Sequence, residues 1–245
     1  MNNYMKYTNI MLESFKFNPK YQELVSKKTE ILTAVSAHYS NEPTSILFVG
    51  FCPWILGTQC KNIFITSVTD DAVKFLDEFN ITYTHIPESS LDNMEKAFDW
   101  VVAVDEFFTF AVDEDEQRSK VGLLIRLARD MVITTLRDYK NQDFNGREFS
   151  QPLAVRNTNG TMVFLEFNDY AYNERNFWKS TVYQVENTEF TAHGEFSRAS
   201  MYFKQLAKFS SDAGARNFLV HKNLMYKSQV KKNYEHVISI TFDGN

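Results

Sequence analysis

Short apolar runs recur along the first part of the chain, and polar segments separate them. Each run is rich in β-branched and aromatic residues, and continuous runs of this kind are typical of buried parallel strands. The strand-like runs are 45–51, 62–67, 81–86, 99–105 and 130–136. Between them, helices are expected at 72–79, 89–97 and 115–129. Strands that alternate with helices in this way predict parallel βαβ units in an open, doubly wound sheet.

The carboxyl ends of these strands are the expected ligand site. Parallel strands end at the same edge of a sheet, and open α/β sheets bind ligands in the crevice outside that edge. The ends near residues 50, 67, 86 and 105 should therefore converge on one hollow. A glycine at the first of these ends, Gly50, lets backbone approach a ligand closely.

Before residue 45 and after residue 137 the chain no longer alternates regularly between strand-like and helical segments. An irregular arm at 1–18 and a helix at 20–39 precede it. After a polar loop at 138–160, strand-like runs predict an antiparallel insertion; they are 161–167, 178–185 and 189–193. A helix from Ser197 to about residue 211 and two antiparallel strands, 217–221 and 235–242, complete the chain. We divide the sequence into a helical arm (1–44), a βα half (45–137), an insertion (138–196) and a C-terminal part of the same domain (197–245).

Composition and charge narrow the class of protein. Hydrophobic residues make up 44% of the 245 residues, which is enough for a sizeable core. The net charge of -5 argues against a nucleic-acid partner, because phosphate binding calls for a basic face. A local group of lysines is interpreted as protecting an exposed sheet edge from pairing with another strand. The group comprises Lys222, Lys227, Lys231 and Lys232.

No metal site or membrane segment is predicted. The two cysteines, Cys52 and Cys60, form no CxxC pair, and the five histidines show no metal-ligand spacing. The acidic run 113–116 is interpreted as a helix N-terminus. The N-terminal residues are polar and no run is long enough to span a bilayer, so a cytoplasmic protein with free thiols is expected.

Three stretches resemble the class I S-adenosylmethionine-dependent methyltransferases. Ile46-Leu-Phe-Val-Gly50 is similar to the first strand and glycine of that family, and Thr69-Asp-Asp-Ala-Val-Lys-Phe-Leu76 to its helix after the second strand. The stretch from Leu206 to Val220 is similar to its passage from the last helix to the sixth strand. The resemblance covers residues 20–243 and implies a Rossmann-like, seven-stranded mixed sheet whose last strand is antiparallel. It also implies S-adenosylmethionine as cofactor and a small-molecule substrate beneath the insertion.

The resemblance also assigns candidate site residues. The cofactor would lie over Gly50, Phe51, Cys52, Ser67 and Val68, with Glu88 at its far end. The residue pattern alone favours Glu88 as a first-turn helix acid. Asp105 and Glu106 follow the fourth strand, where an acid would face the methyl acceptor and act as a base.

The sequence departs from the family at two of these places. The usual G-x-G-x-G loop is replaced by Gly50-Phe-Cys-Pro-Trp-Ile-Leu-Gly57, in which Pro53 lacks a backbone donor. The acid that binds the ribose hydroxyls is replaced by Ser67, which accepts hydrogen bonds more weakly.

Two functions therefore stay open. The first is a methyltransferase that acts on a small molecule. The alternative is a non-catalytic relative that serves as a binding or assembly module, with the aromatic-rich insertion as either a substrate lid or a subunit interface of a homo-oligomer. A third reading, a dinucleotide or nucleotide-sugar enzyme, is disfavoured because no G-x-G-x-x-G motif occurs.

Overall fold

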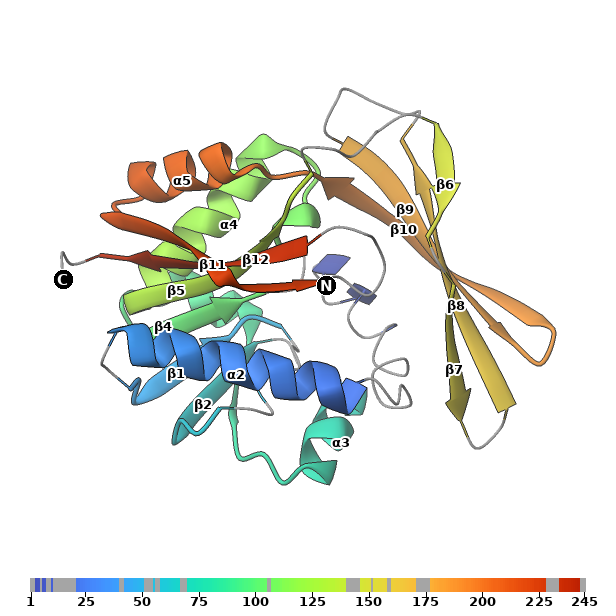
Figure 1. Ribbon diagram of the computed structural model, residues 1–245, viewed down its shortest axis with the longest axis horizontal. Coiled ribbons are helices and arrows are strands. Elements are labelled where there is room, and N and C mark those ends of the chain that lie inside the picture. The colour runs from blue at the N-terminus through green and yellow to red at the C-terminus, as the bar shows by residue number, and fades with distance from the viewer. Residues whose placement is uncertain are drawn as a thin grey trace.

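A large mixed sheet with helices on both faces carries a smaller antiparallel sheet at one side (Figure 1). The computed structural model describes residues 3, 4, 6, 7, 10, 21–39, 42–50, 55, 58–66, 70–104, 107–139, 146–150, 152–157, 160–170, 177–227 and 234–242. Every structural statement below concerns these residues.

The large sheet has seven strands in the order β11-β12-β5-β4-β1-β2-β3. Its strands are β1 (Ser45–Phe48), β2 (Asn62–Thr66), β3 (Thr84–Ile86), β4 (Phe98–Ala103), β5 (Ala128–Arg137), β11 (Asn217–Lys227) and β12 (Tyr234–Thr241). The first five are parallel, whereas β12 runs antiparallel to both β5 and β11. The predicted Rossmann-like sheet with an antiparallel last strand is confirmed. Lys222 is interpreted as one of the lysines that protect an exposed sheet edge, and it does lie on β11, an edge strand.

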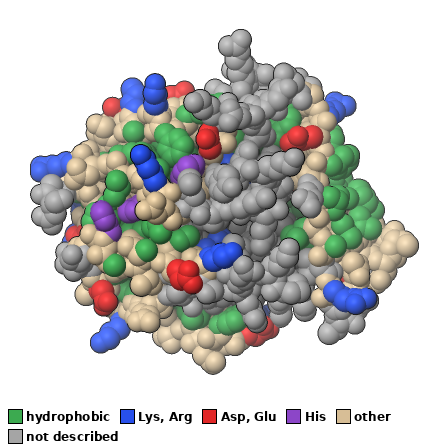
Figure 2. Space-filling view, in the orientation of Figure 1, with side chains coloured by type: hydrophobic (Ala, Val, Ile, Leu, Met, Phe, Trp, Pro, Cys, Tyr) green, Lys and Arg blue, Asp and Glu red, His purple; other side chains and the backbone are tan. Residues whose placement is uncertain are grey.

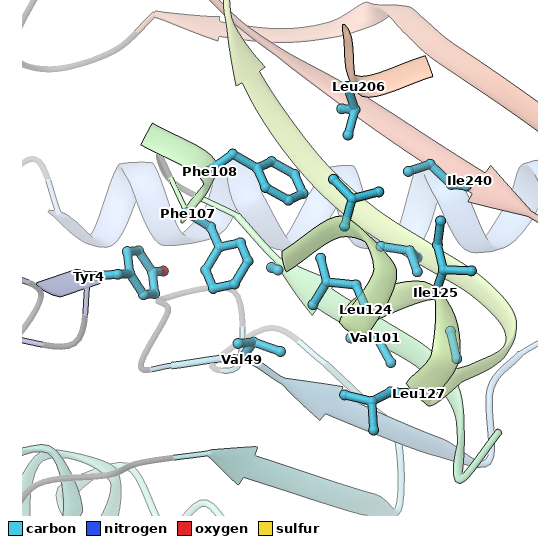
Figure 3. Packing of buried hydrophobic residues seen from close by; sticks show 14 of the residues in the cluster. Tyr4, Val49, Val101, Phe107, Phe108, Leu124, Ile125, Leu127, Leu206 and Ile240 are labelled. Atoms are coloured by element: carbon cyan, nitrogen blue, oxygen red, sulfur yellow. The ribbon is translucent and has the colours of Figure 1, made fainter. Parts of the chain in front are cut away.

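Two hydrophobic layers enclose this sheet, because alternate residues of each strand point to opposite faces. Ile46 and Phe48 of β1 pack with the helices α2 (Tyr21–Tyr39) and α3 (Asp70–Glu78). Leu47 and Val49 pack on the other face with α4 (Glu114–Leu127) and α5 (Phe203–Asp212). Figure 3 shows this second layer, in which Leu124 and Ile125 of α4 lie against the strands. None of the helices in the described ranges is long and apolar enough to cross a bilayer.

Most predicted boundaries hold within a few residues, but several predictions are wrong. The loop expected at 138–160 contains two strands, β6 (Arg147–Phe149) and β7 (Leu153–Asn157), because both pair with the strand at 160–169, which supplies their hydrogen bonds despite the polar sequence. The strand expected at 217–221 continues to Lys227.

Two helices also differ from their predicted ranges. The helix expected at 89–97 is only a 3-10 turn, η2 (Glu88–Asn93), because Leu91 is its single buried residue. The helix expected from Ser197 begins at Phe203 instead. Residues 197–199 pair with 177–179 in a β-ladder, and this tertiary pairing prevails over the local helix-start signal.

The predicted antiparallel insertion is confirmed. It comprises β6 (Arg147–Phe149), β7 (Leu153–Asn157), β8 (Gly160–Asp169), β9 (Phe177–Glu186) and β10 (Glu189–Ala199). Strands β10, β9, β8 and β6 follow one another in the sheet, and β7 also pairs with β8. Because β10 continues to Ala199, the sheet passes the predicted segment boundary at residue 196. The division into four segments otherwise stays a prediction.

A buried arginine fastens the insertion to the large sheet. The guanidinium of Arg198, on β10, donates to Glu166 Oε1 at 2.7 Å and to Ser180 Oγ at 3.0 Å within the insertion. It also donates to Thr109 Oγ1 at 3.3 Å, in the turn η3 (Phe107–Thr109) that follows β4. Its Cζ lies 4.0 Å from the ring centroid of Phe110. Arg198, on β10 of the small sheet, therefore fixes the segment that follows β4 through its contacts with Thr109 and Phe110.

Removal of this guanidinium should destabilise the protein. In Arg198→Met the carboxylate of Glu166 stays buried without its cation, so we expect a loss of about 3–5 kcal/mol in the free energy of unfolding, measured in urea. Arg147→Met is the matched control, because Arg147 pairs with Asp169 in the same sheet but its side chain is 65% exposed. The control should lose about 1 kcal/mol or less. Equal losses in the two variants would contradict the assignment.

Candidate active site at the carboxyl edge of the sheet

A cavity of about 390 Å³ lies at the carboxyl ends of β1 to β4. Each of these strands, or the segment that follows it, contributes to the wall, and α4 and the N-terminal arm complete it. The lining residues are Asn3, Val49, Thr66, Glu88, Leu91, Phe107, Glu116, Ser119, Lys120 and Leu123. The predicted convergence of the four strand ends on one hollow is confirmed.

A larger hollow of about 630 Å³ lies at the opposite edge of the same sheet. It is bordered by α2 and by Thr44, Cys60 and Asn62 at the amino ends of β1 and β2. Burial raises the pKa of the Cys60 thiol, so this cysteine is less reactive than an exposed one. Because ligands of open α/β sheets bind at the carboxyl ends, we take the smaller cavity as the candidate active site.

The turn after β1 is fixed by a hydrogen bond between neighbouring strands. Gly50 has a φ of 82°, in the left-handed region that only glycine adopts without strain. Its buried N–H donates to Thr66 Oγ1 at 2.9 Å. Glycine is therefore conformationally required at position 50, and its amide hydrogen is already bound within the protein.

An ion pair on α4 forms one wall of the cavity. Lys120 Nζ lies 3.1 Å from Glu116 Oε1, and it also donates to the carbonyl oxygen of Phe110. Only 8% of Lys120 is exposed, and burial lowers the pKa of its amine while Glu116 partly opposes that change. A charged lysine is thus held beneath the cavity surface by one carboxylate and one carbonyl.

The same glutamate closes the N-terminus of α4. Asp113 accepts from the N–H of Glu116 at 2.7 Å, and Glu116 Oε2 accepts from the N–H of Val112 at 2.8 Å. Asp113 is therefore the N-cap of α4, and the bond from Val112, the residue before the N-cap, helps to fix the position of the Glu116 carboxylate. The interpretation of 113–116 as a helix N-terminus is confirmed, and in the described part of the chain no group of three or more His, Cys, Asp or Glu could hold a metal.

Aromatic residues form the apolar wall and tie the N-terminal arm to it. The ring of Tyr4 meets that of Phe107 edge-on, with centroids 5.3 Å apart, and Figure 3 shows the two rings side by side next to Val49. Tyr4 also donates to the carbonyl oxygen of Val104 at 3.0 Å. The arm therefore lies at the cavity mouth, against the segment that follows β4.

The structure describes two of the residues that the resemblance assigns to the site. Gly50 is buried directly beside the cavity residue Val49, and Glu88 lines the cavity at the start of η2. The other assigned residues lie outside the described residues, and their roles stay predictions; they are Phe51, Cys52, Ser67, Val68, Asp105 and Glu106. Their described neighbours Thr66 and Phe107 do line the cavity.

Sequence reasoning missed the contribution of α4. Gln117 and Lys120 fall on the same helical face as Val121 and Leu124, and all four are buried. Polar residues on an otherwise apolar helix face were the available signal, since such residues need a partner inside the protein. The i,i+4 spacing of Glu116 and Lys120 pointed to that partner.

Comparisons with known proteins place the fold. No protein-family model matches the chain, and no curated protein matches its sequence. A solved S-adenosylmethionine-dependent methyltransferase from Clostridium acetobutylicum ATCC 824 matches 98% of this chain and 99% of its own, with a TM-score of 0.69 and 10% identity.

Two further solved structures share the same architecture. One is CalS10, an amino pentose methyltransferase from Micromonospora echinaspora with S-adenosylmethionine bound; 88% of this chain and 91% of that one align, with a TM-score of 0.62 and 10% identity. The other is the sugar N-methyltransferase KedS8 from Streptoalloteichus, with 90% and 88% aligned, a TM-score of 0.62 and 11% identity. The protein thus has the class I S-adenosylmethionine-dependent methyltransferase fold.

The hydrogen bond from Gly50 to Thr66 can be tested directly. Thr66→Val keeps the side-chain shape but leaves the Gly50 N–H buried without an acceptor, so we expect a loss of about 1–3 kcal/mol in the free energy of unfolding. Thr84→Val, at an exposed position of the edge strand β3, should change it by no more than about 0.5 kcal/mol. A Thr66→Val protein as stable as wild type would show that the turn does not depend on this bond.

Proposed function

We propose that the protein is an S-adenosylmethionine-dependent methyltransferase that acts on a small molecule. The observation that carries the proposal is the single cavity formed by the ends of β1 to β4 in a chain with this fold. Its volume of about 390 Å³ lies within the usual range for small-molecule sites, about 300–1,000 Å³. The cofactor and the reaction are both part of the proposal, because a shared fold alone does not establish either of them.

The charges around the cavity fit such a cofactor. Among the described lining residues, Glu88 and Glu116 are acidic and Lys120 is basic, which leaves an excess of negative charge. S-adenosylmethionine is a net cation, since it carries a sulfonium, an ammonium and a carboxylate. When bound, it supplies a methyl group activated by the positive sulfur. The carboxylates of the wall favour that cation electrostatically.

The assigned residues then divide into three roles. Gly50, Phe51 and Cys52 lie against the methionine part, Ser67 and Val68 against the ribose, and Glu88 at the adenine end. Asp105 and Glu106 face the acceptor, where a carboxylate orients the attacking atom and takes its proton. The insertion (138–196) and the arm (1–44) exclude water and set specificity, as variable covering segments do.

The acceptor is a small molecule with an amine or a hydroxyl group. Two of the aligned structures are an amino pentose methyltransferase and a sugar N-methyltransferase, and each aligns over most of its length. Amino sugars are therefore the first acceptors to test. A cytoplasmic location is a further part of this proposal. The proposal also includes no nucleic-acid partner, which the net charge of -5 supports.

The alternative, a non-catalytic binding or assembly module, has its own support. The Gly50 amide is already bonded to Thr66, and Ser67 stands where a ribose-binding acid is usual. The insertion also exposes large apolar residues: Phe149 is 63% exposed and Phe190 is 62% exposed. Figure 2 shows hydrophobic side chains gathered over this part of the molecule. Exposed apolar groups of this kind suit a second copy of the chain as partner.

Cofactor binding decides between the two functions. A ligand that binds only the folded state adds about 2.7 kcal/mol at 100 times its Kd, so excess S-adenosylmethionine or S-adenosylhomocysteine should raise the Tm. Gly50→Val should abolish this rise. Gly214→Val is the control, because Gly214 also has a positive φ, 95°, but lies at the end of α5 in open space. No rise in the wild-type protein at millimolar cofactor would favour the binding module.

Catalysis is tested separately from binding. Asp105→Asn should keep the affinity for S-adenosylhomocysteine, because the role proposed for Asp105 is toward the acceptor, but should lower methyl transfer by about 100-fold or more. The measurement is transfer of label from S-adenosylmethionine to a panel of amino sugars, with Asp92→Asn, at an exposed position of η2, as the control. Equal turnover in Asp105→Asn and wild type would remove Asp105 from the mechanism.

A further inference from the structure

The glycine turn offers less to a ligand than the fold usually supplies. In the resembling family the backbone of a G-x-G-x-G loop cradles the methionine part of the cofactor. Here the N–H of Gly50 is donated to Thr66 Oγ1, and Pro53 has no N–H to donate. Because neither residue offers a backbone N–H to a ligand, charged side chains of the same cavity are further candidates to bind a charged amino-acid end.

The ion pair on α4 has unused hydrogen-bonding capacity on the cavity side. A lysine ammonium has three donors, and the contacts of Lys120 with Phe110 and Glu116 account for two. A carboxylate accepts about four hydrogen bonds, and Glu116 receives one from Val112 and one from Lys120. Both side chains line the cavity, so one donor and about two acceptor positions remain there.

We propose that Glu116 and Lys120 together bind the α-amino-acid end of the ligand, with its carboxylate on Lys120 and its ammonium on Glu116. This inference rests on the proposed function and names the contact that recognises the methionine tail of S-adenosylmethionine. The zwitterion and the ion pair are complementary in charge, and Glu88, which also lines the cavity and interacts electrostatically with Lys120, adds a second carboxylate that favours the ligand ammonium. Charge-assisted hydrogen bonds of this kind are the strongest in proteins.

A merely structural role explains the pair less well. Burying an ion pair costs more desolvation than an apolar pair of similar size, and a leucine at position 120 would continue the apolar face of Val121 and Leu124. Burial already lowers the pKa of Lys120, so the charged amine is held against that cost. A ligand carboxylate would give the buried ammonium a further partner and thus stabilise its charged form.

The neighbouring residues are consistent with a binding wall at this place. Asn3, from the N-terminal arm, and Ser119, one residue before Lys120, also line the cavity and add polar groups beside the pair. The bond from the Val112 N–H and the contact with Lys120 hold the carboxylate of Glu116, so its position is set before any ligand arrives. Preorganised charges bind more tightly than charges that must be ordered on binding.

Two ligands that differ only at one end test the inference. S-adenosylhomocysteine carries the amino-acid end, and 5′-methylthioadenosine keeps the adenosine and the sulfur but lacks it. Titration calorimetry of Lys120→Met should show about 10- to 100-fold weaker binding of S-adenosylhomocysteine, with the Kd for methylthioadenosine unchanged. Glu116→Gln, whose amide oxygen can still accept from the Val112 N–H, should show the same selective loss.

The control and the contrary outcomes are defined by the same titrations. Lys208→Met makes the same chemical change on α5, where Lys208 pairs with Asp212 and is 64% exposed, and should alter neither affinity. If both ligands weaken equally in Lys120→Met and Glu116→Gln, the pair only supports the wall and the inference is wrong. If Lys120→Met does not fold, Glu116→Gln decides alone. A wild-type protein that binds neither ligand contradicts the proposed function itself, whereas one that binds both ligands equally contradicts this inference only.

Discussion

The buried guanidinium of Arg198 joins parts of the chain that the sequence keeps far apart. It bonds to Glu166 and Ser180 inside the insertion, and to Thr109 in the turn after β4. Two buried charges are costly unless their remaining donors and acceptors are satisfied, and here several partners share the guanidinium. The insertion is therefore attached through directional bonds, which fix its orientation over the carboxyl edge more narrowly than apolar packing would.

In the candidate site, too, buried polar groups are satisfied by hydrogen bonds within the protein. At the glycine turn the hydroxyl of Thr66 accepts a hydrogen bond from the Gly50 N–H. On α4 the carboxylate of Glu116 accepts from the Val112 N–H at the start of the helix and also pairs with Lys120. The site thus combines a rigid frame with charged groups that face the cavity. Under the proposed function, Glu116 and Lys120 on α4 offer a ligand hydrogen bonds that the Gly50 amide and Pro53 do not.

Much of the fold was accessible to sequence reasoning, whereas less of the site was. Apolar runs such as 45–51 and 99–105 indicated buried parallel strands, and the ends of these strands do line one cavity. Gly50 and Glu88 were placed at its edge on the same grounds. Lys120 was not, because a lysine within a helix is usually solvated, and only the packing of α4 against the sheet shows that this one is buried.

The sequence by itself determined the order of the strands along the chain, their direction and the edge at which a ligand can bind, because hydrophobic period and connection length dictate βαβ geometry. Tertiary structure alone decided which polar side chains meet. Residues 197–199 form a strand rather than a helix start because β9 supplies their hydrogen bonds, and Arg198 meets Thr109 across 89 positions of the chain. Such contacts depend on the relative placement of whole elements, which no local pattern encodes.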